Sequence, residues 1–115
     1  MTDAMITLTA QFTMKAGQVH GALALVNAVK EQSDAEQPGT LLYLVHRVLD
    51  AKNKPTRQLL FYECYRDKQA LNKHLASSSW KALTSKWSTY FEGTSSDIVV
   101  TSLDRFAGFV HLEAP

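Results

Sequence analysis

The stretch Leu59–Trp80, LLFYECYRDKQALNKHLASSSW, predicts a buried strand followed closely by a helix that carries one histidine. Residues 59–65 are rich in apolar and aromatic side chains, which favour strands. Asp67 follows, and its carboxylate can accept hydrogen bonds from the free backbone N–H groups of a first helical turn. We expect the helix to run from Asp67 to about Ala76. Its spacing places four residues on one face: Ala70, Leu71, His74 and Leu75.

The residues before this stretch predict a strand, a helix and a second strand. Met5 to Lys15 alternates between apolar residues and threonine or glutamine, as in a half-buried strand. Apolar residues at helical spacing follow from Gln18 to Asp34, and Pro38-Gly39 marks a turn. Thr40 to Leu49 predicts a strand with apolar residues on both of its faces, so we expect both faces to be covered.

The remaining residues complete a βαββαβ order. Arg57 to Tyr65 is the third strand, and the polar loop before it predicts an antiparallel hairpin with residues 40–49. A further helical segment follows the serines 77–79, and residues 97–105 read as a fourth strand. This order is typical of an α+β, ferredoxin-like fold with an antiparallel sheet. The sheet face away from the helices is apolar or weakly polar, so it needs a partner.

Length and composition indicate one ordinary globular domain. The chain has 115 residues, of which 45% are hydrophobic and 20% charged, with a formal net charge of +1. We expect a single domain over residues 1–115, with a core at about 5–103 and an apolar tail at 104–115. Lys and Arg are not clustered in the sequence, so we expect no nucleic-acid partner.

The cysteine content and the N-terminal residues predict the cellular compartment. Cys64 is the one cysteine, so an internal disulfide is excluded and a reducing compartment is expected. The start of the chain carries Asp3 rather than a basic segment, and no apolar run approaches the roughly 20 residues that cross a bilayer. We therefore expect a cytoplasmic protein with no membrane partner.

Two titratable residues are candidates for catalysis. The imidazole of His74 titrates near neutrality and can accept a proton from a ligand held between helix and sheet. The structural alternative is a buried histidine hydrogen-bonded to a strand residue. Glu63 lies within the apolar sequence FYECY, where a carboxylate is expected to be buried and perturbed. Its structural alternative is an ion pair with Arg47 or Arg66.

Aromatic residues form a candidate binding surface for a flat ligand. Rings suit such a ligand through stacking, although each of them also suits a plain core. The candidate substrate-binding residues are Phe12, Tyr43, Tyr62, Trp80, Trp87 and, in the middle of a strand, His46. The four histidines are scattered and show no HxH, HExxH or CxxC spacing, so no metal site is expected. No glycine-rich nucleotide motif is present, so no cofactor is expected either.

The pattern Phe61-Tyr62-Glu63-x-Tyr65-x-Asp67-x-x-Ala70-x-x-x-His74-Leu75-x-Ser77 resembles the antibiotic biosynthesis monooxygenase (ABM) family. The preceding Gln37-Pro38-Gly39-Thr40-Leu41-Leu42-Tyr43 resembles that family's E-P-G-x-x-x-Y segment, with Gln37 where the family often has an acid. The resemblance extends from about Met5 to Val100. It implies a homodimer of quinol-monooxygenase type, in which two sheets pack face to face as an α+β barrel.

The resemblance also implies an activity: oxidation of electron-rich phenols, anthrones or quinols by O2, without metal or flavin. His74 and Glu63 both match positions of the family pattern. Haem degradation by some relatives uses a tryptophan at the position of His74 and a histidine about ten residues later. That later position is near Thr84 here, and no histidine lies between His74 and His111, which argues against haem.

Two other functions remain open at this point. One is isomerase-type proton transfer on a small carbonyl compound, which would use His74 together with Glu63. The other is a non-catalytic dimeric domain that binds a ligand or acts in a stress response. A fold alone does not decide between them.

Overall fold

The structure, a computed structural model, describes residues 5–111 and confirms the βαββαβ order. The strands are β1 (Ile6–Thr13), β2 (Thr40–Leu49), β3 (Pro55–Tyr65) and β4 (Val99–Leu103). The helices are α1 (Val19–Glu36), α2 (Lys68–Leu75), α3 (Ser78–Ser85), α4 (Trp87–Tyr90) and the 3₁₀ helix η1 (Ser95–Asp97). The strands form one antiparallel sheet in the order β2-β3-β1-β4, which is the ferredoxin-like topology.

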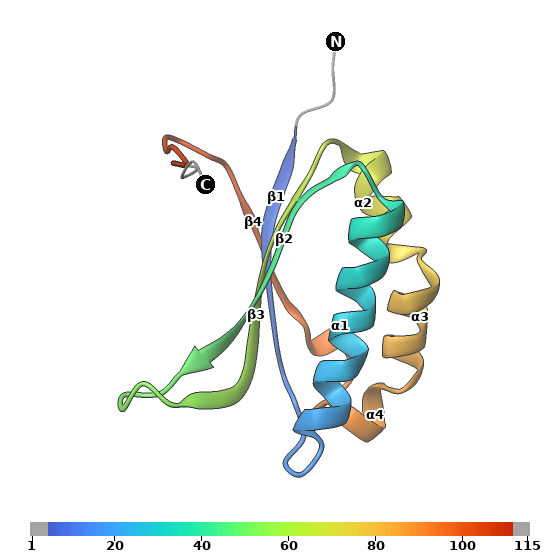
Figure 1. Cartoon of the computed structure of the whole chain (residues 1–115), viewed down its shortest axis with the longest axis vertical. Coiled ribbons are helices and arrows are strands. Elements are labelled where there is room, and N and C mark those ends of the chain that lie inside the picture. Colours follow the sequence, from blue (N-terminus) through green and yellow to red (C-terminus); the bar gives the residue numbers. More distant parts are fainter. Residues whose placement is uncertain (1–4, 112–115) are drawn as a thin grey trace.

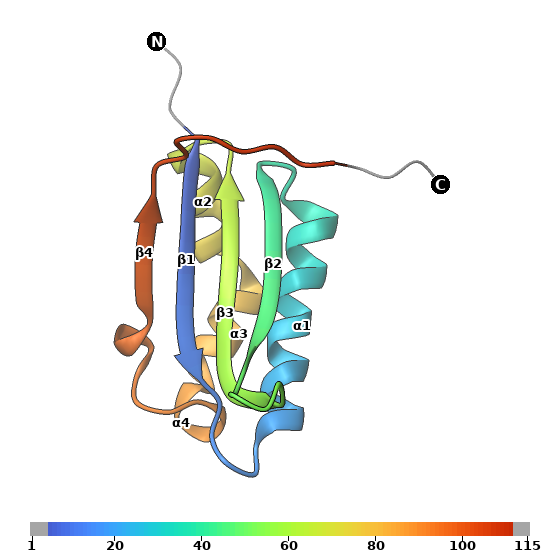
Figure 2. The same cartoon turned by 90° about the vertical axis from the view of Figure 1, so that its left-hand side faces the viewer.

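The four α-helices cover one face of the sheet and leave the other without a covering layer (Figure 1). Strand alternation assigns side chains to the two faces. We call the helix-covered face the inner face; it carries Leu8, Ala10 and Phe12 of β1 beside Phe61 and Tyr65 of β3, all buried. The opposite, outer face points toward the viewer in Figure 2.

The outer face combines apolar side chains on β2, β3 and β4 with threonine and glutamine on the central strand β1. Its members follow from the pairing of the strands, in which Tyr62 lies opposite Thr9 and Leu44. Leu44 of β2 is 47% exposed and Val99 of β4 is 58% exposed. Within one chain the helices cover only one of the two faces of β2, and coverage of the other face by a partner stays a prediction.

Most predicted boundaries hold within two residues, and the differences have local causes. β2 spans the predicted residues, and Asp67 caps α2 by accepting a hydrogen bond from the backbone N–H of Ala70 at 2.9 Å. The helical segment after the serines is divided at Lys86, where the backbone leaves the helical region and α4 begins anew. β4 is shorter than predicted, because residues 95–97 turn into η1.

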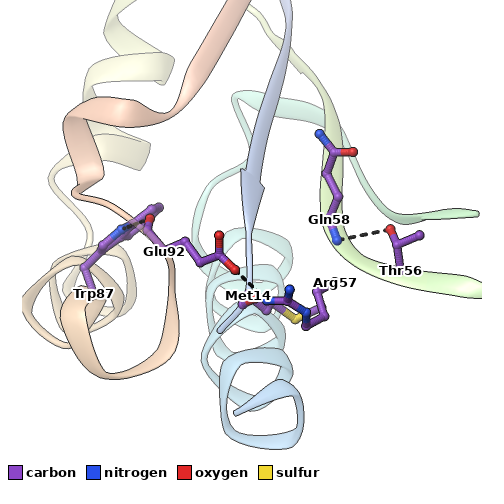
Figure 3. Close-up of polar contacts among 6 residues, drawn as sticks. All are labelled: Met14, Thr56, Arg57, Gln58, Trp87 and Glu92. Atoms are coloured by element: carbon purple, nitrogen blue, oxygen red, sulfur yellow. Dashed lines mark hydrogen bonds and ion pairs between the residues drawn. The ribbon is translucent and has the colours of Figure 1, made fainter. Parts of the chain in front are cut away.

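The end of the sheet near α4 is held by polar contacts between strands and loop (Figure 3). The guanidinium of Arg57 donates to the backbone carbonyl of Met14 at 2.8 Å and to the Glu92 carboxylate at 2.5 Å. The indole N–H of Trp87 donates to the backbone carbonyl of Glu92 at 3.1 Å. These bonds fix the loop that leads from α4 toward β4.

The segment after β4 runs across the outer side of the sheet toward β2 (Figures 1 and 2). Its residues 104–111 are exposed, and Phe106 reaches 99% exposure. Residues 112–115 of the predicted tail lie outside the described part of the chain. No helix within residues 5–111 is long and apolar enough to span a bilayer.

Candidate functional site

The site begins at the turn between α1 and β2, which packs tightly against the start of α2. Gly39 makes this approach possible, because a Cβ at that position would lie 2.7 Å from the Cβ of Ala70. The backbone N–H of Arg66 donates to the carbonyl of Gly39 at 2.8 Å. The end of α1 and the buried side of α2 are thereby brought together, although they are far apart in sequence.

His74 lies on the buried side of α2, as the helical spacing predicts, with only 2% of its surface exposed. Its Nδ1 lies 3.1 Å from Oε1 of Gln37 and 3.2 Å from Oγ of Ser33. The prediction of a strand residue as its partner is wrong, because the end of α1 reaches the ring first. Burial lowers the pKa of His74 to about 4, so the imidazole is neutral at physiological pH.

Glu63 lies on the inner face of β3 and accepts a hydrogen bond of 2.5 Å from the hydroxyl of Tyr65. The alternative of an ion pair with Arg47 or Arg66 is wrong. Arg47 donates to the backbone carbonyl of Thr56, and Arg66 donates to that of Pro38. Burial raises the pKa of Glu63, and the hydrogen bond from Tyr65 opposes that rise only in part.

These two residues line one cavity between the sheet and α2–α3, with a volume of about 280 Å³. The His74 ring lies among aromatic rings, with centroid distances of 5.2 Å to Tyr43, 5.5 Å to Tyr65 and 6.1 Å to Trp80. Burial and the nearby Glu63 carboxylate raise the pKa of the Tyr43 hydroxyl, which therefore stays protonated. The remaining lining is apolar apart from Ser95, and includes Leu8, Ala10, Phe12, Phe61, Leu71, Leu75, Ile98 and Val100.

The structure brings together five of the eight residues that the sequence proposed for the site. The cavity is lined by Phe12, Tyr43, Glu63, His74 and Trp80. Trp87 lies farther along the core, 4.9 Å from the Phe12 ring, and lines a separate hollow near Glu92. Tyr62 and His46 lie on the outer face, and Nδ1 of His46 is 3.2 Å from the carbonyl oxygen of Leu60.

Sequence reasoning did not identify the two residues at the end of α1 that contact His74. Ser33 is 3% exposed and continues the buried stripe of Val26 and Val29 at helical spacing, so a polar residue on that stripe was a usable signal. Gln37 is 5% exposed at the C-terminal cap of α1, and its contact with α2 depends on the tertiary fold. Within residues 5–111, no three His, Cys, Asp or Glu side chains are grouped so that they could hold a metal ion.

The model of the antibiotic biosynthesis monooxygenase family matches residues 5–86, which is most of the chain. The chain belongs to this family. The match contains both segments of the site, the turn that carries Gln37 and the strand–helix unit that carries Glu63 and His74. No curated protein is significantly similar in sequence.

Solved structures support the fold. PA3566 from Pseudomonas aeruginosa is 20% identical, with a TM-score of 0.75, over 93% of this chain and 99% of that chain. Rv0793 from Mycobacterium tuberculosis is 19% identical, with a TM-score of 0.72, over 91% and 98%. An antibiotic biosynthesis monooxygenase is 22% identical, with a TM-score of 0.71, over 89% and 99%. At these identities the likeness concerns the fold alone.

Proposed function

We propose that this family member is a monooxygenase that oxidises a compact, electron-rich phenol, quinol or anthrone with O2 and needs no cofactor. The observation that carries the proposal is the neutral, buried imidazole of His74 in an aromatic cavity. A neutral imidazole accepts a proton, and the surrounding rings of Tyr43 and Trp80 suit a flat substrate. The volume of about 280 Å³ is at the small end of the range for ligand pockets, which favours a compact molecule.

The proposed reaction begins with transfer of the phenolic proton of the substrate to His74. The resulting anion is electron-rich and gives one electron to O2, and the two radicals then combine to form a carbon–oxygen bond. The resulting peroxide anion takes up a proton to become a hydroperoxide, which loses water, so that a CH₂ carbon and O2 give a carbonyl group and H2O. One oxygen atom enters the product, the other leaves as water, and the substrate supplies all the electrons.

The other residues of the cavity have supporting roles in this scheme. The apolar lining excludes water from the reacting anion and radical pair. Tyr43 retains its proton and can donate a hydrogen bond to a substrate oxygen. Glu63, whose pKa is raised by burial, can supply a proton to the peroxide anion and regain one from protonated His74, which closes the cycle.

The proposal is tested by O2 uptake of metal-free protein with a panel of hydroquinones, naphthols and anthrones. Labelling with ¹⁸O2 then follows the oxygen: one labelled atom in the product supports a monooxygenase. Uptake that is present in the protein as purified but absent from metal-free protein would contradict the cofactor-independent mechanism. No uptake above the protein-free control across the panel would favour a non-catalytic binding domain.

A second candidate function is isomerase-type proton transfer on a small carbonyl compound. It is favoured by one observation, namely that a carboxyl of raised pKa and a neutral imidazole line the same cavity. Such a pair can donate and accept protons on one substrate. Exchange of substrate C–H for deuterium from D2O in the absence of O2, lost in Glu63→Gln, would support this function.

We also propose that a second copy of the chain covers the outer face, as a homodimer. Large apolar side chains remain exposed there, and the exposed tail with Phe106 and Phe109 runs along the same side. Exposed apolar side chains gathered on one face are typical of interfaces. Leu44→Glu should shift the sedimentation coefficient toward that of a monomer, whereas Ala82→Glu on the exposed side of α3 should not. A wild-type protein that sediments as a monomer at all concentrations would contradict the proposal.

A further inference from the structure

Gln37 is connected to His74 and Thr40 by a short chain of hydrogen bonds. Thr40 Oγ1 donates to Oε1 of Gln37 at 3.3 Å, and the same oxygen lies 3.1 Å from Nδ1 of His74. The backbone of Gln37 is held as well, because its N–H donates to the carbonyl of Ser33 at 3.1 Å and its carbonyl accepts from Thr40 N–H at 2.9 Å. Gln37 therefore meets the imidazole from a fixed position.

The chemistry of these partners decides which ring nitrogen carries the proton. An amide oxygen only accepts hydrogen bonds, whereas a hydroxyl such as that of Ser33 can donate or accept. If Nδ1 had no proton, its lone pair would face the lone pairs of the Gln37 oxygen at 3.1 Å. If Nδ1 is protonated, Gln37 and Ser33 can both accept from it. Gln37 thus selects the Nδ1–H tautomer, and Ser33 is compatible with either one.

We propose that Gln37 is a positioning residue, which holds His74 in the Nδ1–H tautomer and so presents the lone pair of Nε2 to the cavity. Both hydrogen bonds of the ring involve Nδ1, which leaves Nε2 without a partner among residues 5–111. His74 lines the cavity, and Nε2 is the ring nitrogen that remains available for a ligand there. The benefit of this tautomer for catalysis rests on the proposed role of His74 as a base. The assignment of the tautomer rests only on the hydrogen bonds of Nδ1.

The groups around the ring determine its charge as well as its tautomer. From the sheet, Tyr43, Tyr65 and Glu63 face this side of the cavity, and from α3 the uncharged Trp80 does. The end of α1 contributes Ser33 and Gln37, both uncharged. A carboxylate in place of the Gln37 amide would stabilise the imidazolium form. The amide orients the ring without charging it, which keeps Nε2 able to accept a proton.

The direct test is ¹⁵N NMR of the histidine side chains at neutral pH, without substrate. In the wild-type protein, His74 should show a protonated Nδ1 and an unprotonated Nε2. Gln37→Met keeps the length of the side chain and removes the acceptor, so a substantial fraction of the Nε2–H tautomer should appear. Gln37→Glu should raise the pKa of His74 by at least about one pH unit. Gln69→Met, the same change at an exposed position of α2, should leave the His74 signals unchanged.

A protonated Nε2 in the wild-type protein would overturn the proposal, even if Gln37→Met failed to fold. Signals of His74 that are identical in folded Gln37→Met and in wild type would also overturn it. If a substrate is found, Gln37→Met should lower kcat/KM about tenfold, as expected for the loss of one hydrogen bond. Because the NMR experiment needs no turnover, a failure of the proposed monooxygenase function would leave its result intact.

Discussion

The two faces of the sheet are made by the same strands, yet they have different chemical character. The inner face carries Phe61 and Glu63 of β3 under the helices, whereas the outer face carries Tyr62 between them. The inner face encloses a cavity with two titratable groups, and the outer face presents exposed apolar side chains such as Leu44. Strand alternation thus separates a candidate reaction site from a candidate interface by a single residue step.

Two histidines show the same contrast. His74 is buried, has two hydrogen-bond partners from α1, and has a pKa lowered to about 4. His46 is exposed on the outer side of the edge strand β2 and contacts a backbone carbonyl. The residue type alone therefore says little about function, and the environment on one face makes His74 the candidate base.

Truncation of neighbouring residues on β3 gives the largest expected difference between the faces. Phe61→Ala removes a ring that is 2% exposed and stacked on Phe12 at 5.0 Å, so it should lower the free energy of unfolding by about 3–5 kcal/mol. Tyr62→Ala should cost much less in the monomer, because its ring lies on the uncovered face. Denaturant unfolding at several protein concentrations measures both. Equal losses for the two variants at low concentration would contradict the assignment of faces.

The pH dependence of stability should show the burial of neutral His74. Its pKa is about 4 in the folded protein and 6.5 ordinarily, so between these values the unfolded chain binds a proton that the folded chain does not. Stability should therefore fall as the pH drops from 6.5 to 4, by at most about 3 kcal/mol.

Glu63 acts in the opposite direction, because its raised pKa means that the folded chain keeps a proton that the unfolded chain loses above pH 4.5. The difference in unfolding free energy between wild type and His74→Gln, measured from pH 4 to 7, isolates the histidine. Parallel curves for the two proteins would mean that His74 is not buried as a neutral group.

Gly39 tests how the inner face is assembled. Gly39→Ala places a Cβ 2.7 Å from that of Ala70, so the turn must shift away from α2 at a cost of about 1–3 kcal/mol. The shift should also disturb the contact of Gln37 with His74, which ¹⁵N NMR would detect. Combining the change with Ala70→Gly should restore the NMR signals. An unchanged stability and spectrum in Gly39→Ala would show that the close approach is unimportant.

The smallest effect on the free energy of unfolding is expected for the ion pair at the end of the sheet, which lies on neither face. Arg57 and Glu92 form an ion pair with side chains 43% and 50% exposed (Figure 3). Glu92→Gln should lower the free energy of unfolding by less than about 1 kcal/mol, and salt should reduce the difference. A loss larger than that of Gly39→Ala, persisting at high salt, would contradict this ranking.

Local signals in the sequence were sufficient for the strands, the helices and the cap of α2. The alternation of Met5–Lys15 and the carboxylate of Asp67 act over a few residues, so they can be interpreted without the fold. The alternation of β3 also excluded one of the proposed pairs of site residues. Tyr62 and Glu63 are consecutive in a strand and point to opposite faces, so they cannot both line one cavity.

The partners of His74 were beyond sequence reasoning, because they depend on how α1 ends beside α2. Gln37 reaches the ring only through the Gly39 turn and its packing on Ala70. The ion pair considered for Glu63 was also wrong, because the partner of this side chain depends on how the strands and loops pack. Tyr65, two residues along the same face of β3, supplies the hydrogen bond, whereas both arginines donate to backbone carbonyls.

The central claim is that the cavity of the inner face carries the chemistry through His74. The most direct measurement compares O2 uptake by metal-free wild type, His74→Gln and His20→Gln, the last of which changes an exposed histidine of α1. We predict a loss of about 10²- to 10⁴-fold for His74→Gln, as expected for removal of a general base, and wild-type uptake for His20→Gln. Wild-type uptake by folded His74→Gln would contradict the claim.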